Sequence, residues 1–280
     1  MKKIFKFRLN FILFFLSLLI SLTLCEILLR RLKLGYNASP LNPSKTSHHE
    51  NPPNFEFTTY SPYGEWNSFN IKFDEFGNRK LDDLCNWNKF EEKYQLILMG
   101  DSFVEGVQVS DSDSLAGILQ KELCQYGVKV HNFGTSSYGP VLSYAHLLQQ
   151  NKVNPKINLS SSTVLINFLF ENDIEDDNKY YEYSKNNYLE EDSKFTVNAT
   201  TKLSFLQRIN RRSYLARLIR RSHLTLLKLL DKNRNEGINK LKIKYFSPID
   251  RCRFRDSELH VSNEFVGRIK EFANSKGSIY

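Results

Sequence analysis

The sequence predicts an α/β protein in which a doubly wound parallel sheet follows an N-terminal transmembrane helix. Three observations predict this fold class. From residue 94 onward, short apolar strands alternate with amphipathic helical segments, as in a parallel sheet that helices cover. Three successive strands each end in a polar segment. An apolar run over residues 9–29 is long enough to cross a bilayer.

Residues 1–33 are predicted to form a basic tail and a membrane anchor. The apolar run follows four basic residues, Lys2, Lys3, Lys6 and Arg8. No small-x-small cleavage site follows the run, which favours an uncleaved anchor over a removed signal peptide. Leu24 is too large for the position before a lipoprotein cysteine, so Cys25 is not expected to carry a lipid. Basic residues beyond the run nearly balance the leading cluster, so charge alone does not set the orientation.

Residues 34–70 are predicted to be a linker. This stretch contains five of the eight prolines of the chain and shows no helical periodicity. The pair His48-His49 lies within it. Since no further ligands stand at a matching spacing, the pair is interpreted as part of a solvated loop rather than as a metal site.

The elements of the predicted domain, residues 71–280, follow in order. Residues 94–99 are a strand, and Ser112 or Asp113 caps a helix that Gly127 ends. The other predicted elements are a strand at 128–131, a helix that begins at Pro140, a strand at 163–170, a helix at 263–274 and the first residues of a strand after Gly277.

The three strand ends carry the side chains of chemical interest. They are Gly100-Asp101-Ser102, the loop Asn132-Phe133-Gly134 and the pair Asn172-Asp173. The carboxyl ends of parallel strands meet at one edge of a sheet, where open α/β folds bind ligands. A serine at the start of the following helix lies among free backbone N–H groups that favour developing negative charge.

Residues 73–175 together resemble the SGNH (GDSL-type) hydrolase family, which has the flavodoxin-like three-layer sandwich. The segment Phe73-Asp74-Glu75-Phe76-Gly77-Asn78-Arg79 is similar to one that precedes the serine strand in membrane-anchored members. The resemblance implies that Ser102 is the nucleophile and that Asn172 is an oxyanion donor. Asp101 and Asp173 would support the loops.

The resemblance leaves the third oxyanion donor open. The family usually has a glycine five residues after the asparagine of the second block, where this chain has Ser137. The backbone N–H of Ser137 or that of Gly134 would then complete the oxyanion hole.

The resemblance also implies a base in a late Asp-x-x-His block, and this chain has no such motif. His260 follows Asp256 by four residues, and His223 lies in a basic helical stretch. Both are interpreted as non-catalytic. The domain is therefore expected to be incomplete at its C-terminus, with the catalytic Asp and His beyond Tyr280.

Two charged stretches are predicted to be insertions. The acidic residues 172–192 are expected to form a mobile, solvated segment over the site rather than a cation site, since they lack calcium-loop spacing. Residues 202–244 are predicted to form a basic helical insertion with an apolar underside. A solvated face is the first interpretation, contact with an anionic membrane the second and nucleic-acid binding the last.

The four cysteines are too few and too scattered for a disulfide framework or a zinc site. Cys124 is expected to be an inert buried thiol. A Cys85–Cys252 bridge stays open as an alternative. No metal and no cofactor are expected.

These observations predict a membrane-anchored serine esterase, or an O-acyl (acetyl) transfer enzyme, that acts on O-acyl groups of carbohydrate or lipid. The alternative is a non-catalytic SGNH-like module that binds a glycan or a partner protein. The protein is expected to be single-pass, with an extracytoplasmic domain in the periplasm or at the cell surface. The expected partners are a small ester or acylated substrate and the membrane, but no nucleic acid.

Overall fold

The computed structural model describes residues 2–31, 39–59, 66–184, 195–197, 205–220, 222 and 256–280. The chain divides into two compact units. The smaller unit consists of Met1–Gly35 and Leu203–Lys244, and the larger unit consists of Tyr36–Lys202 and Tyr245–Tyr280.

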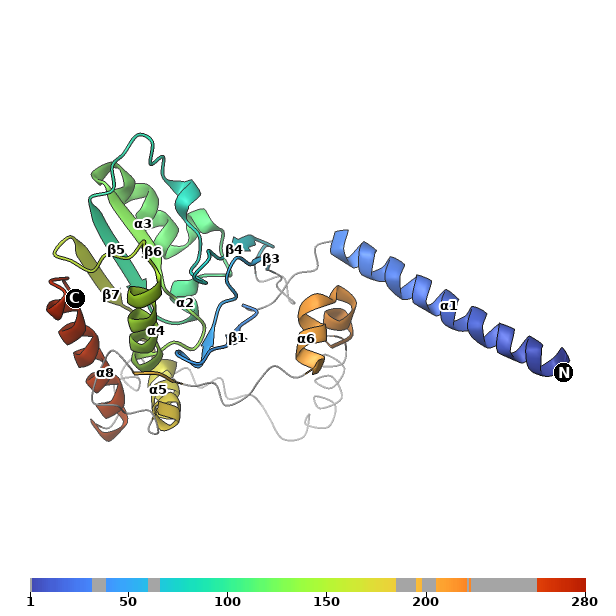
Figure 1. Ribbon diagram of the computed structural model, residues 1–280. Coiled ribbons are helices and arrows are strands. Elements are labelled where there is room, and N and C mark those ends of the chain that lie inside the picture. Colours follow the sequence, from blue (N-terminus) through green and yellow to red (C-terminus); the bar gives the residue numbers. More distant parts are fainter. Residues whose placement is uncertain are drawn as a thin grey trace, which may run out of the picture. The chain divides into compact units, whose positions relative to one another are not determined.

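A parallel sheet of three strands lies at the centre of the larger unit, in the order β6-β5-β7 (Figure 1). Its strands are β5 (Tyr94–Met99), β6 (Val128–Asn132) and β7 (Thr163–Asn167). Ile279, in the segment where a strand was predicted after Gly277, forms an isolated parallel bridge with Val164 of β7. The sheet confirms the predicted α/β class.

Helices cover both faces of this sheet. Consecutive side chains of β5 point to opposite faces, and the apolar ones therefore need cover on both sides. Leu96 and Leu98 pack with Ala116 of α3 (Leu115–Leu123) on one face. Ile97 and Met99 belong to the larger core on the other face. That core is formed with α4 (Pro140–Val153), α5 (Glu171–Ser184) and α8 (Asp256–Ser275), the last of which contains the helix predicted at 263–274.

The described part of the predicted linker packs within the larger unit. It forms two short antiparallel pairs, β1 (Asn42–Pro43) with β2 (His49–Glu50), and β3 (Glu56–Thr58) with β4 (Asn70–Lys72). The solvated loop expected at His48-His49 is wrong, because the His49 side chain is buried and its Nε2 lies 2.7 Å from the Ser136 carbonyl oxygen.

The acidic segment after β7 is a helix rather than a solvated insertion over its described part. Residues 171–184 form α5, and Asp173 and Asp177 are fully buried. The Asp177 carboxylate accepts hydrogen bonds from the Val141 backbone N–H and the Ser262 hydroxyl. Asp177 therefore joins α5 to the first turn of α4 and to α8.

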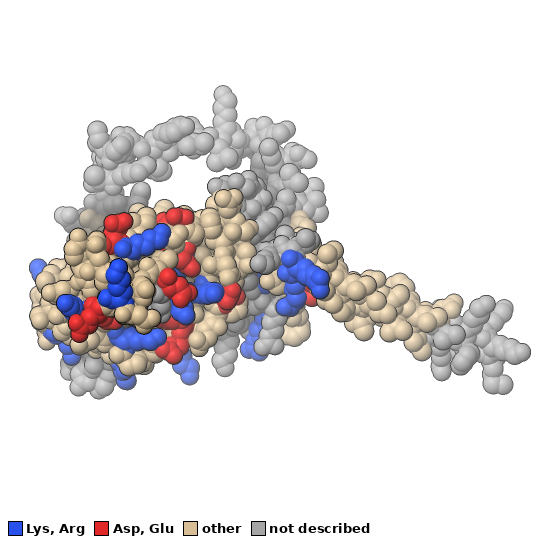
Figure 2. Space-filling model, turned by 90° about the horizontal axis from the view of Figure 1, so that it is seen from above, with Lys and Arg blue, Asp and Glu red and all other residues tan. Residues whose placement is uncertain are grey.

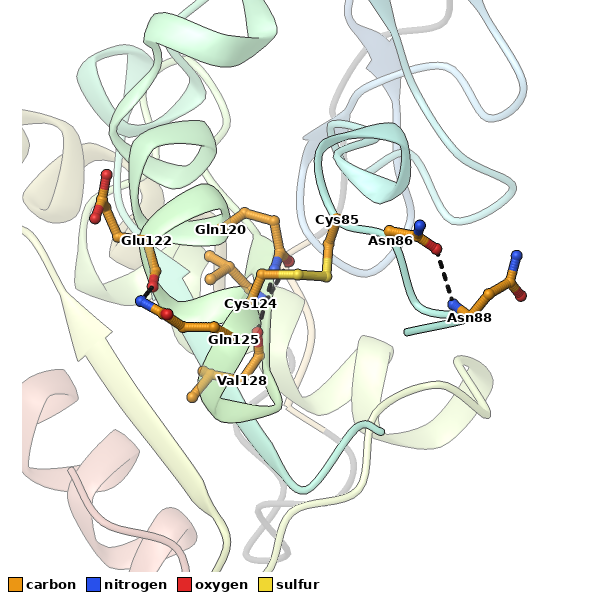
Figure 3. The surroundings of a disulfide bond; sticks show 9 residues. Cys85, Asn86, Asn88, Gln120, Glu122, Cys124, Gln125 and Val128 are labelled. Carbon is orange, nitrogen blue, oxygen red and sulfur yellow. Dashed lines mark hydrogen bonds between the residues drawn. A yellow bond between two sulfur atoms is a disulfide. The ribbon is translucent and has the colours of Figure 1, made fainter. Parts of the chain in front are cut away.

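A disulfide joins Cys85 to Cys124 and corrects the prediction of an inert thiol (Figure 3). The two Cα atoms lie 5.8 Å apart, within the range that a disulfide spans. The bond ties the segment after a short 3₁₀ helix (Asp82–Leu84) to the end of α3. Because Cys85 is paired with Cys124, the Cys85–Cys252 alternative is wrong; Cys252 itself lies outside the described residues.

The smaller unit contains the N-terminal helix α1 (Lys2–Arg31). Its residues Asn10–Arg31 are long and apolar enough to cross a membrane. The middle of this helix carries no charged side chain, as its tan surface shows (Figure 2). The basic insertion predicted at 202–244 is helical at α6 (Phe205–Arg212) and at residues 214–220. Residues 223–244, including His223, lie outside the described part.

Candidate active site

The turn from β5 to α2 (Ser102–Glu105) depends on Gly100. Its φ is +150°, and a Cβ atom there would lie 2.7 Å from Val104 Cγ2 and 3.0 Å from the Phe168 carbonyl oxygen. Any side chain at this position would displace α2 or the end of β7. The close approach therefore places Ser102 directly at the edge of the sheet.

Asp101 fixes the start of α2. It is the N-cap residue, it is buried, and its Oδ1 accepts a hydrogen bond of 2.9 Å from the Phe103 backbone N–H. Ser102 follows as the first helical residue and is half-buried. The Ser102 hydroxyl makes no hydrogen bond with any residue in the part of the chain that the structure describes.

The loop after β6 packs against α2 through Asn132 and Gly134. Asn132 Nδ2 donates to the Val104 carbonyl oxygen, and Asn132 Oδ1 accepts from the Gly134 backbone N–H. A Cβ atom on Gly134 would lie 2.3 Å from the Glu105 nitrogen, so only glycine fits there. The Gly134 N–H, one of the two expected oxyanion donors, is thus already bonded.

Ser137 has a left-handed backbone, with a φ of +64°. Glycine adopts this conformation readily, whereas other residues do so at a cost in free energy. The loop therefore has a glycine-like conformation at the position where the resembling family has glycine. The Ser137 side chain lies beside Asp176 and Tyr180 of α5.

Asn172 lies at the third strand end, in the first turn of α5. Its side chain is exposed, and its Nδ2 lies 3.4 Å from Asp101 Oδ2 and 3.4 Å from Asp173 Oδ1. These contacts bring the first and third predicted blocks together. The structure thus gathers Asp101, Ser102, Asn172 and Asp173 at one edge of the sheet.

Asp173 shapes the turn between β7 and α5. Its Oδ2 accepts a hydrogen bond of 2.7 Å from the Phe170 backbone N–H. Burial, together with the nearby carboxylates of Asp101, Asp177 and Asp176, raises the pKa of Asp173 to about 7, although the bond to Phe170 opposes this shift. Asp173 therefore takes up a proton near neutral pH.

Sequence reasoning missed an aromatic pair beside Ser102. Phe103 is 63% exposed, and its ring stacks on that of Phe170 with 4.4 Å between centroids. The two rings come from the first and third strand ends and offer an apolar surface next to the hydroxyl. The position of Phe103 directly after Ser102 in the sequence could have indicated an aromatic side chain beside the candidate nucleophile.

A buried network behind α2 was missed as well. The carboxylate of Glu105 is fully buried and accepts hydrogen bonds from the hydroxyls of Ser39 and Ser136. Burial raises the pKa of Glu105. The network connects the segment after α1 to the loop that carries Ser137.

Arg79 is the last residue of the segment that resembles membrane-anchored members. Its side chain binds the backbone at the end of α2 and just after it. Its guanidinium donates to the carbonyl oxygens of Glu105, Gly106 and Val109, and it forms an ion pair of 2.8 Å with Asp111. Burial lowers the pKa of Arg79, although the neighbouring carboxylates oppose that shift. The segment thus has a structural role directly behind the candidate nucleophile.

No histidine in the described part forms a hydrogen bond with Ser102. His49 and His146 are buried and bonded to the Ser136 carbonyl oxygen and to Asn78, respectively. Burial lowers the pKa of both to about 4, so both are neutral at pH 7. His260 lies on α8 and is exposed. Within the described residues, no group of three His, Cys, Asp or Glu could hold a metal ion.

Neither a scan against protein-family models nor a search of curated proteins finds a match to this chain.

Proposed function

We propose that the protein is a membrane-anchored serine esterase, or an O-acyl transfer enzyme, that acts on acylated carbohydrate or lipid. The contact between Asp101 and Asn172 carries this proposal. It brings a serine at a helix start and an amide at a neighbouring strand end to the same edge of a parallel sheet. That arrangement is the one that the resemblance to SGNH hydrolases implies.

The proposed chemistry uses each group in one role. The Ser102 oxygen attacks the ester carbonyl carbon, and its proton passes to a base. The backbone N–H groups of Ser102 and Ser137 and the Asn172 amide donate hydrogen bonds to the oxyanion that forms. The alcohol then leaves, and the acyl group on Ser102 passes to water or to an acceptor hydroxyl. The Phe103–Phe170 pair would contact the apolar part of the substrate.

The resemblance implies a base in an Asp-x-x-His block, and these 280 residues contain no such motif. An exogenous base therefore belongs in the test. The full chain in detergent is incubated with p-nitrophenyl acetate, with and without imidazole. The peptide that contains Ser102 is then analysed for an acetyl group by mass spectrometry.

We expect acetylation of Ser102 that imidazole increases and that Ser102→Ala abolishes. Asn172→Ala should slow the acetylation about 10²–10³-fold, the usual value of one oxyanion donor. Ser161→Ala, an exposed serine at a distant loop, is the matched control and should leave the rate unchanged. Equal labelling of Ser102 and other serines would contradict the proposal.

A second candidate is a non-catalytic module that binds a glycan or partner protein in the same crevice. The observation that favours it is the absence of a base at Ser102 among the described residues. An unreactive Ser102, together with retained binding of acetylated oligosaccharide that Asn172→Ala weakens, would support this candidate over the enzyme.

We also propose that the larger unit is extracytoplasmic. The Cys85–Cys124 disulfide supports this location, since such bonds persist in oxidising compartments and are rare in the cytosol. The basic tail before the apolar helix would then stay in the cytoplasm.

A further inference from the structure

Glu26 is a carboxylate within the helix that is long and apolar enough to cross a membrane. It lies five residues before Arg31, hence roughly 7.5 Å from the helix end at a rise of about 1.5 Å per residue. A charged group at this depth is costly unless neighbouring groups bond to it. Arg30 provides one partner, with its Nε 2.8 Å from Glu26 Oε1.

The segment that follows α6 provides the other partners of Glu26. Its carboxylate accepts hydrogen bonds from the Ser213 hydroxyl and from the backbone N–H groups of Tyr214 and Leu215. The Ser213 hydroxyl in turn accepts from the Ala216 N–H. Glu26 and Ser213 therefore satisfy the first turn of the helix at 214–220 and fix it to the end of α1.

A cleft of about 660 Å³ lies between α1 and α6. Leu22 and Ile27 of α1 and Phe205 and Ile209 of α6 line it, which makes much of its wall apolar. Arg208 also lines the cleft. Arg208 is exposed and forms no ion pair with any residue of the described ranges, so its charge is available to a ligand.

The outer surface of the same segment is amphipathic. Phe205 and Leu206 are each 75% exposed, and Ile219 is 60% exposed. Arg208 and Arg220 stand among these apolar side chains. Such a segment, held beside the end of a membrane span, lies at the depth where apolar side chains meet acyl chains and arginine meets phosphate.

We propose that the cleft between α1 and α6 binds an anionic phospholipid. The lipid phosphate pairs with Arg208, and one acyl chain lies along Leu22, Ile27 and Ile209. Lipid binding at this cleft requires that α1 spans the membrane, and it does not depend on any activity at Ser102. The bilayer is the occupant that this surface fits, because the exposed Phe205 and Ile209 line the cleft together with Leu22 and Ile27 of the apolar helix α1.

The test uses the full chain reconstituted in vesicles and a fluorescent reporter, Phe205→Trp. Quenching of the added tryptophan by brominated phosphatidylglycerol is compared with quenching by brominated phosphatidylcholine at equal mole fraction. The signal of the parent chain, which contains Trp66 and Trp87, is subtracted. Arg208→Gln is then introduced, with Lys152→Gln of α4 as a control that also removes one exposed positive charge.

We expect stronger quenching by the anionic lipid and a preference that Arg208→Gln reduces about fivefold, the usual value of one basic side chain at an anionic surface. Lys152→Gln should leave the preference unchanged. Equal quenching by the two lipids, or an unchanged preference in Arg208→Gln, would overturn the proposal. Absence of quenching together with concentration-dependent cross-linking would assign the surface to a second copy of the chain and would also overturn it.

Discussion

The loop after β6 and the segment after β7 both carry candidate oxyanion donors, but the protein holds them in opposite ways. Two buried side chains hold the first loop at Ser136. His49, which is neutral at pH 7, bonds the Ser136 carbonyl oxygen, and Glu105 accepts a hydrogen bond from the Ser136 hydroxyl. The second begins α5, where Asn172 is exposed and reaches its two carboxylate neighbours only at 3.4 Å. The first donor is therefore preorganised, while the second is free to adjust to a ligand.

The two regions also differ in the sign of their response to acid. Burial lowers the pKa of His49 to about 4, below its ordinary 6.5, so its contribution to stability is lost as the pH falls from 6.5 toward 4. Burial raises the pKa of Asp173 and Asp177 to about 7, above their ordinary 3.8, so their contribution is lost as the pH rises from 4 to 7. Acid should thus loosen the first region and tighten the second.

The largest expected effect comes from Glu105→Ala. It leaves two half-buried donors, the hydroxyls of Ser39 and Ser136, without their acceptor. Since each unmade hydrogen bond away from water costs about 1–3 kcal/mol, the free energy of unfolding should fall by about 2 kcal/mol or more. Urea unfolding of the chain in detergent measures this loss.

Glu105→Gln is the matched control, because its amide oxygen still accepts a hydrogen bond and a serine hydroxyl can rotate to accept from its amide nitrogen. It should cost about 1 kcal/mol or less. A similar large loss in both variants would show that the charge of Glu105, rather than its hydrogen bonds, holds the loop after β6.

The sequence predicted the parts of this comparison that depend on local pattern. Short apolar runs and the turn residues Gly100 and Gly134 identified the strand ends, so the positions of Ser102, Asn172 and Asp173 at that edge of the sheet were predicted in advance. The supporting groups were missed because their contacts join distant parts of the chain. Ser39 bonds Glu105 across 66 residues, and His49 bonds Ser136 across 87.

Two other features were beyond sequence reasoning for physical reasons. Four cysteines allow several pairings, and only the fold shows that Cys85 and Cys124 come within bonding range. The left-handed conformation of Ser137 depends on the packing of its loop against α5, and the residue type alone argues against it.

The second prediction concerns the acid response of α5. Asp177→Asn keeps an acceptor for the Val141 N–H and removes the charge. We expect this variant to be more stable than the parent above pH 7, by at least about 1.4 kcal/mol, the value of one pKa unit. The two should converge near pH 4, where Asp177 is protonated. Thermal melting between pH 4 and 8 tests this, and a constant difference across that range would refute it.

The third prediction concerns the acid response of the loop after β6. His49 Nε2 donates to the Ser136 carbonyl oxygen, which leaves Nδ1 to accept from His48. His49→Gln keeps a donor toward Ser136 but does not titrate. It should cost about 1 kcal/mol at pH 7 and reduce the loss of melting temperature between pH 6.5 and 4. His260→Gln, at an exposed histidine, should leave that loss unaltered.

The smallest expected effect is that of Ser137→Gly. Glycine relieves a left-handed conformation that costs a non-glycine residue about 1–2 kcal/mol, but it also gains unfolded-state entropy and loses the contacts of the hydroxyl with Asp176 and Tyr180. The net change in unfolding free energy should be under about 1 kcal/mol. Because the backbone N–H is retained, acetylation of Ser102 should proceed at the parent rate.

Ser137→Pro removes that N–H and cannot adopt a φ of +64°, so it should lower both stability and acetylation. If Ser137→Pro reacted as fast as the parent, the preorganised loop after β6 would have no part in the chemistry, and the difference between the two regions would be structural alone.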